Sequence, residues 1–280
     1  MFRICRIGVA PAPGYFVQHF GPTLMRLLLL LVCSIVPIAL MAQADTTGQA
    51  ADLEEQRAQS GVDPTRVLSR ASFSQNMTDP SGDAVSFATR LRYTMGFGRW
   101  SVGMRQEFIS RHSGEPGTGF PTGRGDLRLS LLNAFHVKGR VALAASADID
   151  LPTGSTGFSK EAAVVTAGVT FSYTIKPTLI FAMQPQYTFA PIKDAIVPEV
   201  STLTVRSFLA HFSTSGWFYV FEPRPVFDLA NERTNFVLSP IIGRNLAKGY
   251  SFALLAEFST AQWALDNTGN LYLMGLTKNF

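Results

Sequence analysis

The sequence is poor in cysteine and in charge, and beyond its N-terminal segment it has no long apolar stretch. Its only two cysteines, Cys5 and Cys33, lie in the first 44 residues, which we expect to be removed. The expected mature chain then has no thiol, which excludes disulfides, thiolate metal sites and cysteine nucleophiles. Charged residues make up only 16% of the chain and aromatic residues 11%. This composition is unlike that of a disordered chain, and we expect no nucleic-acid partner.

The first 44 residues have the features of a secretory signal peptide. Arg26 precedes an apolar run over residues 27–40, and residues 42–44 form the small-x-small pattern that signal peptidase cleaves. Met25 is an alternative translation start. An uncleaved N-terminal anchor is the other interpretation, although the run is short for a helix that spans a bilayer. Removing this segment takes away three arginines and no acid, which lowers the net charge from +4 to +1.

The rest of the chain divides into a short polar segment and a long repetitive region. No stretch beyond residue 44 approaches the roughly 18 apolar residues that a transmembrane helix needs. We expect residues 45–64 to form a periplasmic segment with a short helix around residues 52–59. From residue 65 to residue 280, runs of about ten residues alternate apolar with small or polar side chains, and turn residues separate the runs.

Residues 85–97 show the alternation most clearly. Phe87, Leu91 and Tyr93 fall on one face of an extended strand, and Arg90 and Arg92 fall on the other. A helix would mix these two sets, so the period of two favours a strand. We predict about twelve strands, with ten or fourteen as the alternatives. They are 65–77, 85–97, 100–111, 126–137, 140–151, 163–175, 178–190, 201–212, 217–228, 235–246, 250–259 and 270–280.

The linkers between these strands alternate in length. Tight turns are expected at 98–99, 138–139, 176–177, 213–216 and 247–249, and longer loops at 112–125, 155–162, 192–200 and 260–269. Outer-membrane barrels have short periplasmic turns and longer extracellular loops. The pattern therefore predicts a closed antiparallel transmembrane β-barrel in a bacterial outer membrane. The terminal Phe280 on an alternating last strand resembles the signal that outer-membrane assembly machinery recognises.

Two further groups of residues bear on the barrel. Aromatic side chains are expected at the level of the lipid headgroups; they are Trp100, Tyr173, Tyr187, Trp217, Tyr219 and Tyr250. Four prolines lie inside predicted strands, where each removes a ladder hydrogen bond and a bulge or bend is expected; they are Pro185, Pro223, Pro225 and Pro240.

The middle of the chain resembles a known family. Residues 123–127 (GRGDL) open a strand, residues 150–154 (DLPTG) close the next, and strands containing 168–173 and 187–189 follow. This pattern is similar to the outer-membrane family named for the meta-pathway of phenol degradation, which is described as a family of transporters. The resemblance covers about residues 85–280. It implies a barrel that passes small, often aromatic or hydrophobic, molecules, and it carries no catalytic residues.

Alternation places most ionisable side chains of the predicted strands on the inner face, because a basic side chain at the lipid midplane costs about 2–4 kcal/mol. One interpretation is a charged pore constriction that selects solutes; the other is a salt-bridged plug that fills a narrow barrel. The pairs of Glu107 with Arg90 and Arg105, and of Glu222 with Arg224, are the first to test. The predicted pore-lining residues are Arg90, Arg92, Arg105, Glu107, Arg111, Arg128, Asp148, Asp150, Glu222, Arg224, Asp228 and Glu257, and alternation adds Arg66, Arg70 and Arg206.

A membrane-embedded lipid hydrolase is the rival class. His211 and Ser213 have the His-x-Ser spacing of such enzymes, in which the histidine activates the serine. They fall at a predicted periplasmic turn, however, without an evident group to orient the histidine. We therefore expect no enzyme, no cofactor and no metal site. The sequence predicts a monomeric, passive channel for small molecules, some of them hydrophobic or aromatic, in contact with outer-membrane lipids; a closed structural barrel is the alternative.

Overall fold

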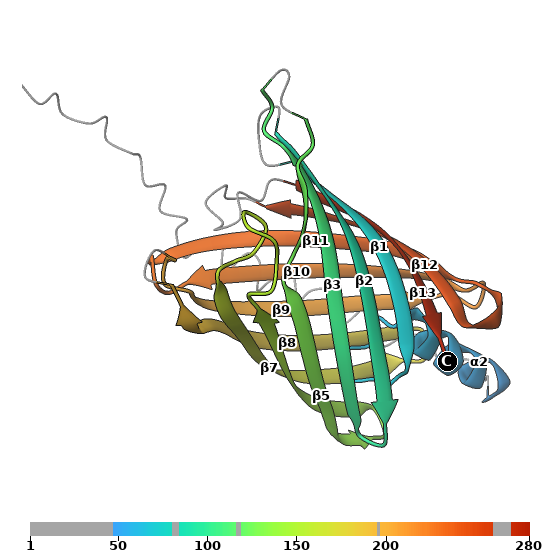
Figure 1. Cartoon of the computed structure of the whole chain (residues 1–280). Coiled ribbons are helices and arrows are strands. Elements are labelled where there is room, and N and C mark those ends of the chain that lie inside the picture. The colour runs from blue at the N-terminus through green and yellow to red at the C-terminus, as the bar shows by residue number, and fades with distance from the viewer. Residues whose placement is uncertain (1–46, 80–83, 116–118, 195–196, 260–269) are drawn as a thin grey trace, which may run out of the picture. The chain divides into compact units, whose positions relative to one another are not determined.

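The described part of the chain is a closed antiparallel β-barrel of twelve strands, with one short extra strand and a helix ahead of the barrel (Figure 1). The computed structural model describes residues 47–79, 84–115, 119–194, 197–259 and 270–280. The predicted signal peptide and the predicted 260–269 loop lie outside the described residues. The barrel strands are β1 (Arg70–Asp79), β2 (Val85–Phe97), β3 (Trp100–His112), β5 (Leu127–Lys138), β6 (Val141–Leu151), β7 (Ala162–Lys176), β8 (Leu179–Lys193), β9 (Ser201–Phe212), β10 (Trp217–Asp228), β11 (Arg233–Asn245), β12 (Tyr250–Ser259) and β13 (Asn270–Asn279).

The sheet closes because the first and last strands pair. Each barrel strand is hydrogen-bonded to its neighbours along the chain, and β1 pairs with both β2 and β13. Phe73, for example, lies opposite Leu91 on one side and Leu276 on the other. Closure leaves no strand edge, which a β-structure in hydrocarbon requires, since lipid offers no hydrogen bonds to a free backbone N–H or C=O. The predicted class and strand number are confirmed.

Two elements differ from the sequence-based prediction. The first strand begins at Arg70 rather than at residue 65, because Asp63 holds the chain in a turn by accepting hydrogen bonds from the backbone N–H and the hydroxyl of Thr65. The three-residue β4 (Thr122–Arg124), which was not predicted, pairs with Phe108–Ser110 near the C-terminal end of β3. The predicted N-terminal helix is present and longer than expected, as α2 (Thr47–Ser60).

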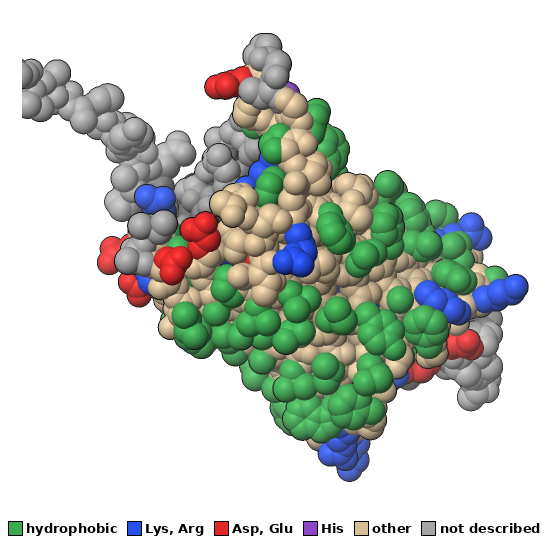
Figure 2. Space-filling view, viewed as in Figure 1, with side chains coloured by type: hydrophobic (Ala, Val, Ile, Leu, Met, Phe, Trp, Pro, Cys, Tyr) green, Lys and Arg blue, Asp and Glu red, His purple; other side chains and the backbone are tan. Residues whose placement is uncertain are grey.

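The outer face of the barrel is apolar. Figure 2 shows hydrophobic side chains gathered over the strands of one face, with lysine and arginine at the edges of that band. All six aromatic residues expected at the headgroup level are exposed. In the described part of the chain, no helix is both long and apolar enough to cross a membrane.

The connections follow the predicted alternation with one exception. At the end that holds both termini of the barrel, the turns are short, and the 3-10 turn η2 (Ala247–Gly249) is one of them. At the other end, the β10–β11 connection spans only residues 229–232, which is as short as the 213–216 turn. The other described connections at that end, such as residues 152–161, are longer.

The prolines interrupt the ladders without shifting them. Between β9 and β10, no pairs form over Glu222–Pro225, yet the register is the same on both sides of this gap. Pro240 leaves a similar gap between β11 and β12. The bulges expected at these positions are not found there; shifts of register occur instead within the β5–β6 and β7–β8 pairs.

Gly243 on β11 provides space for an inner-face aromatic ring. A Cβ atom at Gly243 would lie 2.1 Å from Cζ of Phe218, which is 1% exposed. We therefore expect Gly243→Ala to lower the free energy of unfolding by about 1–3 kcal/mol, because the ring must leave its rotamer or the strands must separate. Urea unfolding followed by tryptophan fluorescence measures this. Gly119→Ala, in open space, is the matched control, and an equal effect of both changes would contradict the assignment.

Candidate functional site

The inner face of the barrel carries two clusters of charged side chains. They lie on opposite sides of the closed ring of strands, one on β2, β3, β5 and β6 and the other on β9 to β12. Because strand side chains alternate between faces, each inner position is identified by outward-pointing apolar neighbours, such as Leu91 and Tyr93 on either side of Arg92. Of the twelve predicted pore-lining residues, ten belong to these clusters.

The first cluster is built around a row of arginines on neighbouring strands. Arg92 lies opposite Arg105, Arg105 lies opposite Arg128, and Arg128 lies opposite Asp150. The Asp150 carboxylate, only 3% exposed as a residue, accepts hydrogen bonds from Nε and Nη2 of Arg128 at 2.5 and 2.6 Å. Lys160 Nζ lies 3.3 Å from the same carboxylate. We name this set, with Arg90, Glu107 and Asp148, the arginine wall.

Glu107 connects two arginines of this wall. Its Oε1 accepts a hydrogen bond from Arg90 Nε at 2.6 Å and lies 3.3 Å from Arg105 Nε. The second contact does not have the geometry of a hydrogen bond, and Arg105 Nε is a buried donor without a hydrogen-bond partner. The predicted pairing of Glu107 with both arginines is thus present, with one strong and one weak contact.

The second cluster, which we name the balanced cluster, has equal numbers of the two charges. Glu222, 1% exposed, accepts hydrogen bonds from Nε of Arg206 at 2.6 Å and from Nε of Arg224 at 3.0 Å. Arg224 Nη2 donates to Glu257 Oε1 at 2.9 Å and to Ser239 Oγ at 3.2 Å. The guanidinium of Arg206 also stacks on Phe208, 4.8 Å from its ring centre. Two arginines and two glutamates therefore satisfy one another.

The remaining predicted residues have other roles. Arg111 is exposed near the end of β3, where it donates to the backbone of Gly157 and stacks on Phe158 in the β6–β7 connection. Asp228 accepts hydrogen bonds from the backbone and side chain of Asn231 and so closes the β10–β11 turn.

Arg66 precedes the first strand and pairs with Glu54 and Asp63, so its assignment to a strand face was wrong. Arg70 donates to the carbonyl of Gly61.

The helix α2 lies at the end of the barrel where the chain terminates (Figure 1). Its Leu53 is 4% exposed and packs into a group of inner-face apolar side chains on β8, β9 and β10. We name this group the apolar cup; its members are Ile180, Ala182, Phe208, Ala210, Phe212, Phe218 and Val220. Sequence reasoning missed this contact. The signal was the poor alternation of 201–212, whose end carries large apolar residues on both faces.

Polar contacts fix α2 to several strands at this end. Asn245 donates to the carbonyl of Gln56, and Asn279 to that of Gln59, both at 2.7 Å. Arg57, buried, donates to Asp63 and, at 2.7 Å, to the hydroxyl of Thr174 on β7. Because Thr174, Asn245 and Asn279 belong to β7, β11 and β13, the helix lies across the mouth of the barrel.

The proposed hydrolase pair does not form a dyad. His211 is exposed on the outer face, with its ring 6.3 Å from that of Tyr219, and Ser213 Oγ pairs with Ser215 Oγ at 2.9 Å. No hydrogen bond joins His211 to Ser213 in the described structure. Among the residues that the structure describes, no three His, Cys, Asp or Glu side chains gather as metal ligands would.

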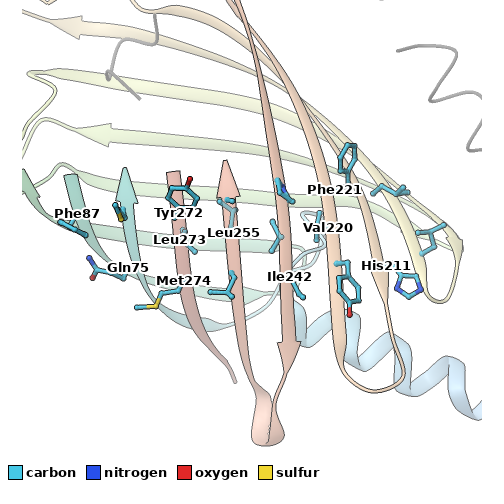
Figure 3. A pocket seen from close by; sticks show the side chains of 18 residues that line it. Gln75, Phe87, His211, Val220, Phe221, Ile242, Leu255, Tyr272, Leu273 and Met274 are labelled. Atoms are coloured by element: carbon cyan, nitrogen blue, oxygen red, sulfur yellow. The ribbon is translucent and has the colours of Figure 1, made fainter. Parts of the chain in front are cut away.

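A separate apolar hollow of about 870 Å³ lies along the wall from β8 through β13 to β2. Figure 3 shows its lining, in which Gln75 and His211 are among the few polar side chains. Outer-face residues such as Phe221, Leu254 and Met274 are prominent in it. The hollow includes Pro240, where the β11–β12 ladder is interrupted.

Comparison with known proteins places the fold among outer-membrane porins and channels. The chain is similar to the COG4313 outer membrane channel from Pseudomonas putida F1, with a TM-score of 0.61, 10% identity, and coverage of 85% of this chain and 100% of that one. It is also similar to the NanC porin (TM-score 0.56, 10% identity, 76% and 100% covered) and to the KdgM porin (0.53, 9%, 75% and 99%). No protein-family model and no curated protein sequence matches the chain. The resemblance to the phenol meta-pathway family therefore stays a prediction.

The balanced cluster allows a direct test of the inner-face assignment. Glu222→Ala leaves Arg206 and Arg224 without their shared carboxylate, and we expect the free energy of unfolding to fall by about 3 kcal/mol, the low end for a broken buried ion pair. Urea unfolding of the refolded protein measures it. Glu199→Ala is the matched control, since Glu199 is exposed and makes no ion pair with any described residue. Similar losses in both variants would rule out a buried, paired Glu222.

Proposed function

We propose that this chain is a bacterial outer-membrane channel through which small molecules, hydrophobic and aromatic ones among them, pass passively. The observation that carries the proposal is the separation of its two faces: apolar side chains cover the outside of a closed barrel, and charged side chains line the inside. Lipid stabilises the first arrangement, and a hydrated lumen accommodates the second. The fold shared with porins and channels supports the same role.

The exposure of the inner charges favours a hydrated lumen over a solid salt-bridged core. The side chains of Arg90 and Arg206 are 27% and 31% exposed although both point inward and both are ion-paired. A dry plug would bury such groups at a high desolvation cost. These exposures support a hydrated lumen, in which the predicted constriction would act on solutes by charge and size.

In this proposal, α2 controls the periplasmic exit. It crosses the mouth that both barrel termini share, and the only large apolar side chain of its described residues is Leu53, held in the apolar cup. Displacing α2 would uncover a mouth lined by aromatic and aliphatic side chains, which suits solutes with an apolar body. The apolar hollow beside the interrupted ladder at Pro240 also supports the choice of hydrophobic solutes, because its apolar lining offers such molecules a binding site on the lipid-facing side of the wall.

The remaining parts of the proposal concern export and assembly. Residues 1–44 serve as a cleaved signal peptide, and the barrel inserts as a monomer. Phe280 is 74% exposed just after β13, with its backbone N–H bonded to the carbonyl of Ser69. This accessible position supports its recognition by the assembly machinery.

Weakening the seat of α2 tests the channel. Leu53→Ala removes the apolar anchor, which costs about 2–5 kcal/mol in a packed site, so α2 should leave the mouth more often. We expect a higher mean single-channel conductance, or a larger open fraction, in planar bilayers than for the unaltered protein. Glu55→Ala, on an exposed position of α2, is the control and should leave the current unchanged.

A reversible cross-link completes this test. Gln56→Cys with Asn245→Cys, joined by a short bifunctional methanethiosulfonate, should hold α2 in place in a mature chain that otherwise has no thiol. Conductance should fall on cross-linking and return on reduction. If neither the unaltered protein nor Leu53→Ala carries any current, the channel proposal fails and the closed structural barrel takes its place.

A further inference from the structure

The arginine wall contains a row of opposed like charges, which destabilises the barrel unless another group compensates the charge. Arg92, Arg105 and Arg128 lie directly opposite one another on three adjacent strands, all on the inner face. Like charges in directly opposed positions destabilise a sheet. The balanced cluster across the barrel shows that this chain can pair arginines with equal numbers of carboxylates when only structure is needed.

The carboxylates of the arginine wall do not balance its cations. Arg90, Arg92, Arg105, Arg128 and Lys160 stand against only Glu107, Asp148 and Asp150. Asp150 is already shared by Arg105, Arg128 and Lys160, and Glu107 by Arg90 and Arg105. Among the described residues, an excess of positive charge therefore remains on the side of the lumen that carries the arginine wall.

The excess is greatest at Arg92, which lies directly opposite Arg105. Arg92 makes no hydrogen bond and no ion pair with any residue that the structure describes. The charges near it include those of Arg70, Arg90 and Arg128 and the carboxylate of Asp148. Arg105 makes no hydrogen bond with any described residue: its contacts with Glu107 and Asp150, at 3.3 and 4.0 Å, are ion pairs, and its side chain is 19% exposed. The two guanidinium groups thus lie on directly opposed positions of adjacent strands, and each has donors that no described residue accepts.

We propose that Arg92 and Arg105 form a binding site for the carboxylate group of a small organic anion in the lumen. A guanidinium presents its donors in a planar fork that matches a carboxylate, and such charge-assisted bonds are stronger than neutral ones. A bound carboxylate supplies the negative charge that the arginine row lacks. The site deepens the proposed function, since it names a solute class for the same lumen, but its occupation does not depend on whether the barrel conducts.

Equilibrium binding tests the site without any need for current. Isothermal titration calorimetry of the refolded full-length mature protein in detergent at low salt uses benzoate as the probe and benzamide as its neutral counterpart. Low salt matters because exposed charge interactions are screened over about 10 Å at 0.1 M. We expect saturable binding of benzoate and none of benzamide. Arg92→Gln should weaken benzoate binding at least ~10-fold, as expected for the loss of hydrogen bonds to a charged group.

Two variants separate recognition from charge and from folding. Arg92→Lys retains the positive charge but not the planar fork, so benzoate should bind with intermediate affinity. Arg244→Gln removes an arginine that stacks on Trp217 at the outer face, and it should bind benzoate as the unaltered protein does. Heat denaturation of each variant, with the same transition as the unaltered protein, shows that the barrel has formed.

Several outcomes would overturn the site. These are no saturable binding of benzoate, equal binding of benzamide, or an Arg92→Gln variant that folds and binds benzoate undiminished. The fate of the proposed function is decided separately by conductance. Benzoate binding to a barrel that carries no current would retain the site and refute the channel, and current without benzoate binding would do the reverse.

Discussion

Every feature of this barrel depends on one constraint, that a sheet in hydrocarbon must hydrogen-bond all of its own backbone. Pairing of β1 with β13 meets it by leaving no free edge. Once the sheet is closed, each strand has one face toward lipid and one toward the interior, and the alternation of side chains assigns every residue to one of them. The outer face then accepts Phe73, Leu91 and Leu276, whereas Arg92 has only the lumen available.

Alternation also explains which parts of the structure could be predicted. Strands such as β2, with apolar and polar residues in strict alternation, were placed to within a residue. The ion pairs of Glu107 and Glu222 were predicted from the inward direction of their side chains alone. The start of β1 could not be placed, because Asp63 and Thr65 end the N-terminal segment through side-chain hydrogen bonds that leave no periodic pattern. The effect of the prolines could not be predicted either. Pro223 and Pro240 remove ladder hydrogen bonds, but the closed sheet keeps the same register on both sides of each gap, so no bulge forms.

The interior could be predicted less well than the wall. Facing places Arg92, Arg105 and Arg128 inside, but their direct opposition depends on the relative register of three strands, which a single sequence does not contain. The apolar cup was hidden for a different reason. Its residues break the alternation of β9 and β10 because these apolar side chains point inward. There they pack against Leu53, which lies on a helix more than a hundred residues earlier in the chain, and not against lipid. A departure from the expected pattern was the only trace of that contact.

The position of α2 has a consequence for how the molecule is assembled. The helix precedes β1, which pairs with the last strand of the chain, and it lies at the mouth where β1 begins and the last strand ends. Its tether to the wall is thus only the short stretch between Ser60 and Arg70. Helix α2 could therefore dock in the mouth after β1 and β13 have paired and the barrel has closed. Leaving the mouth by the same route would not require any two strands to separate.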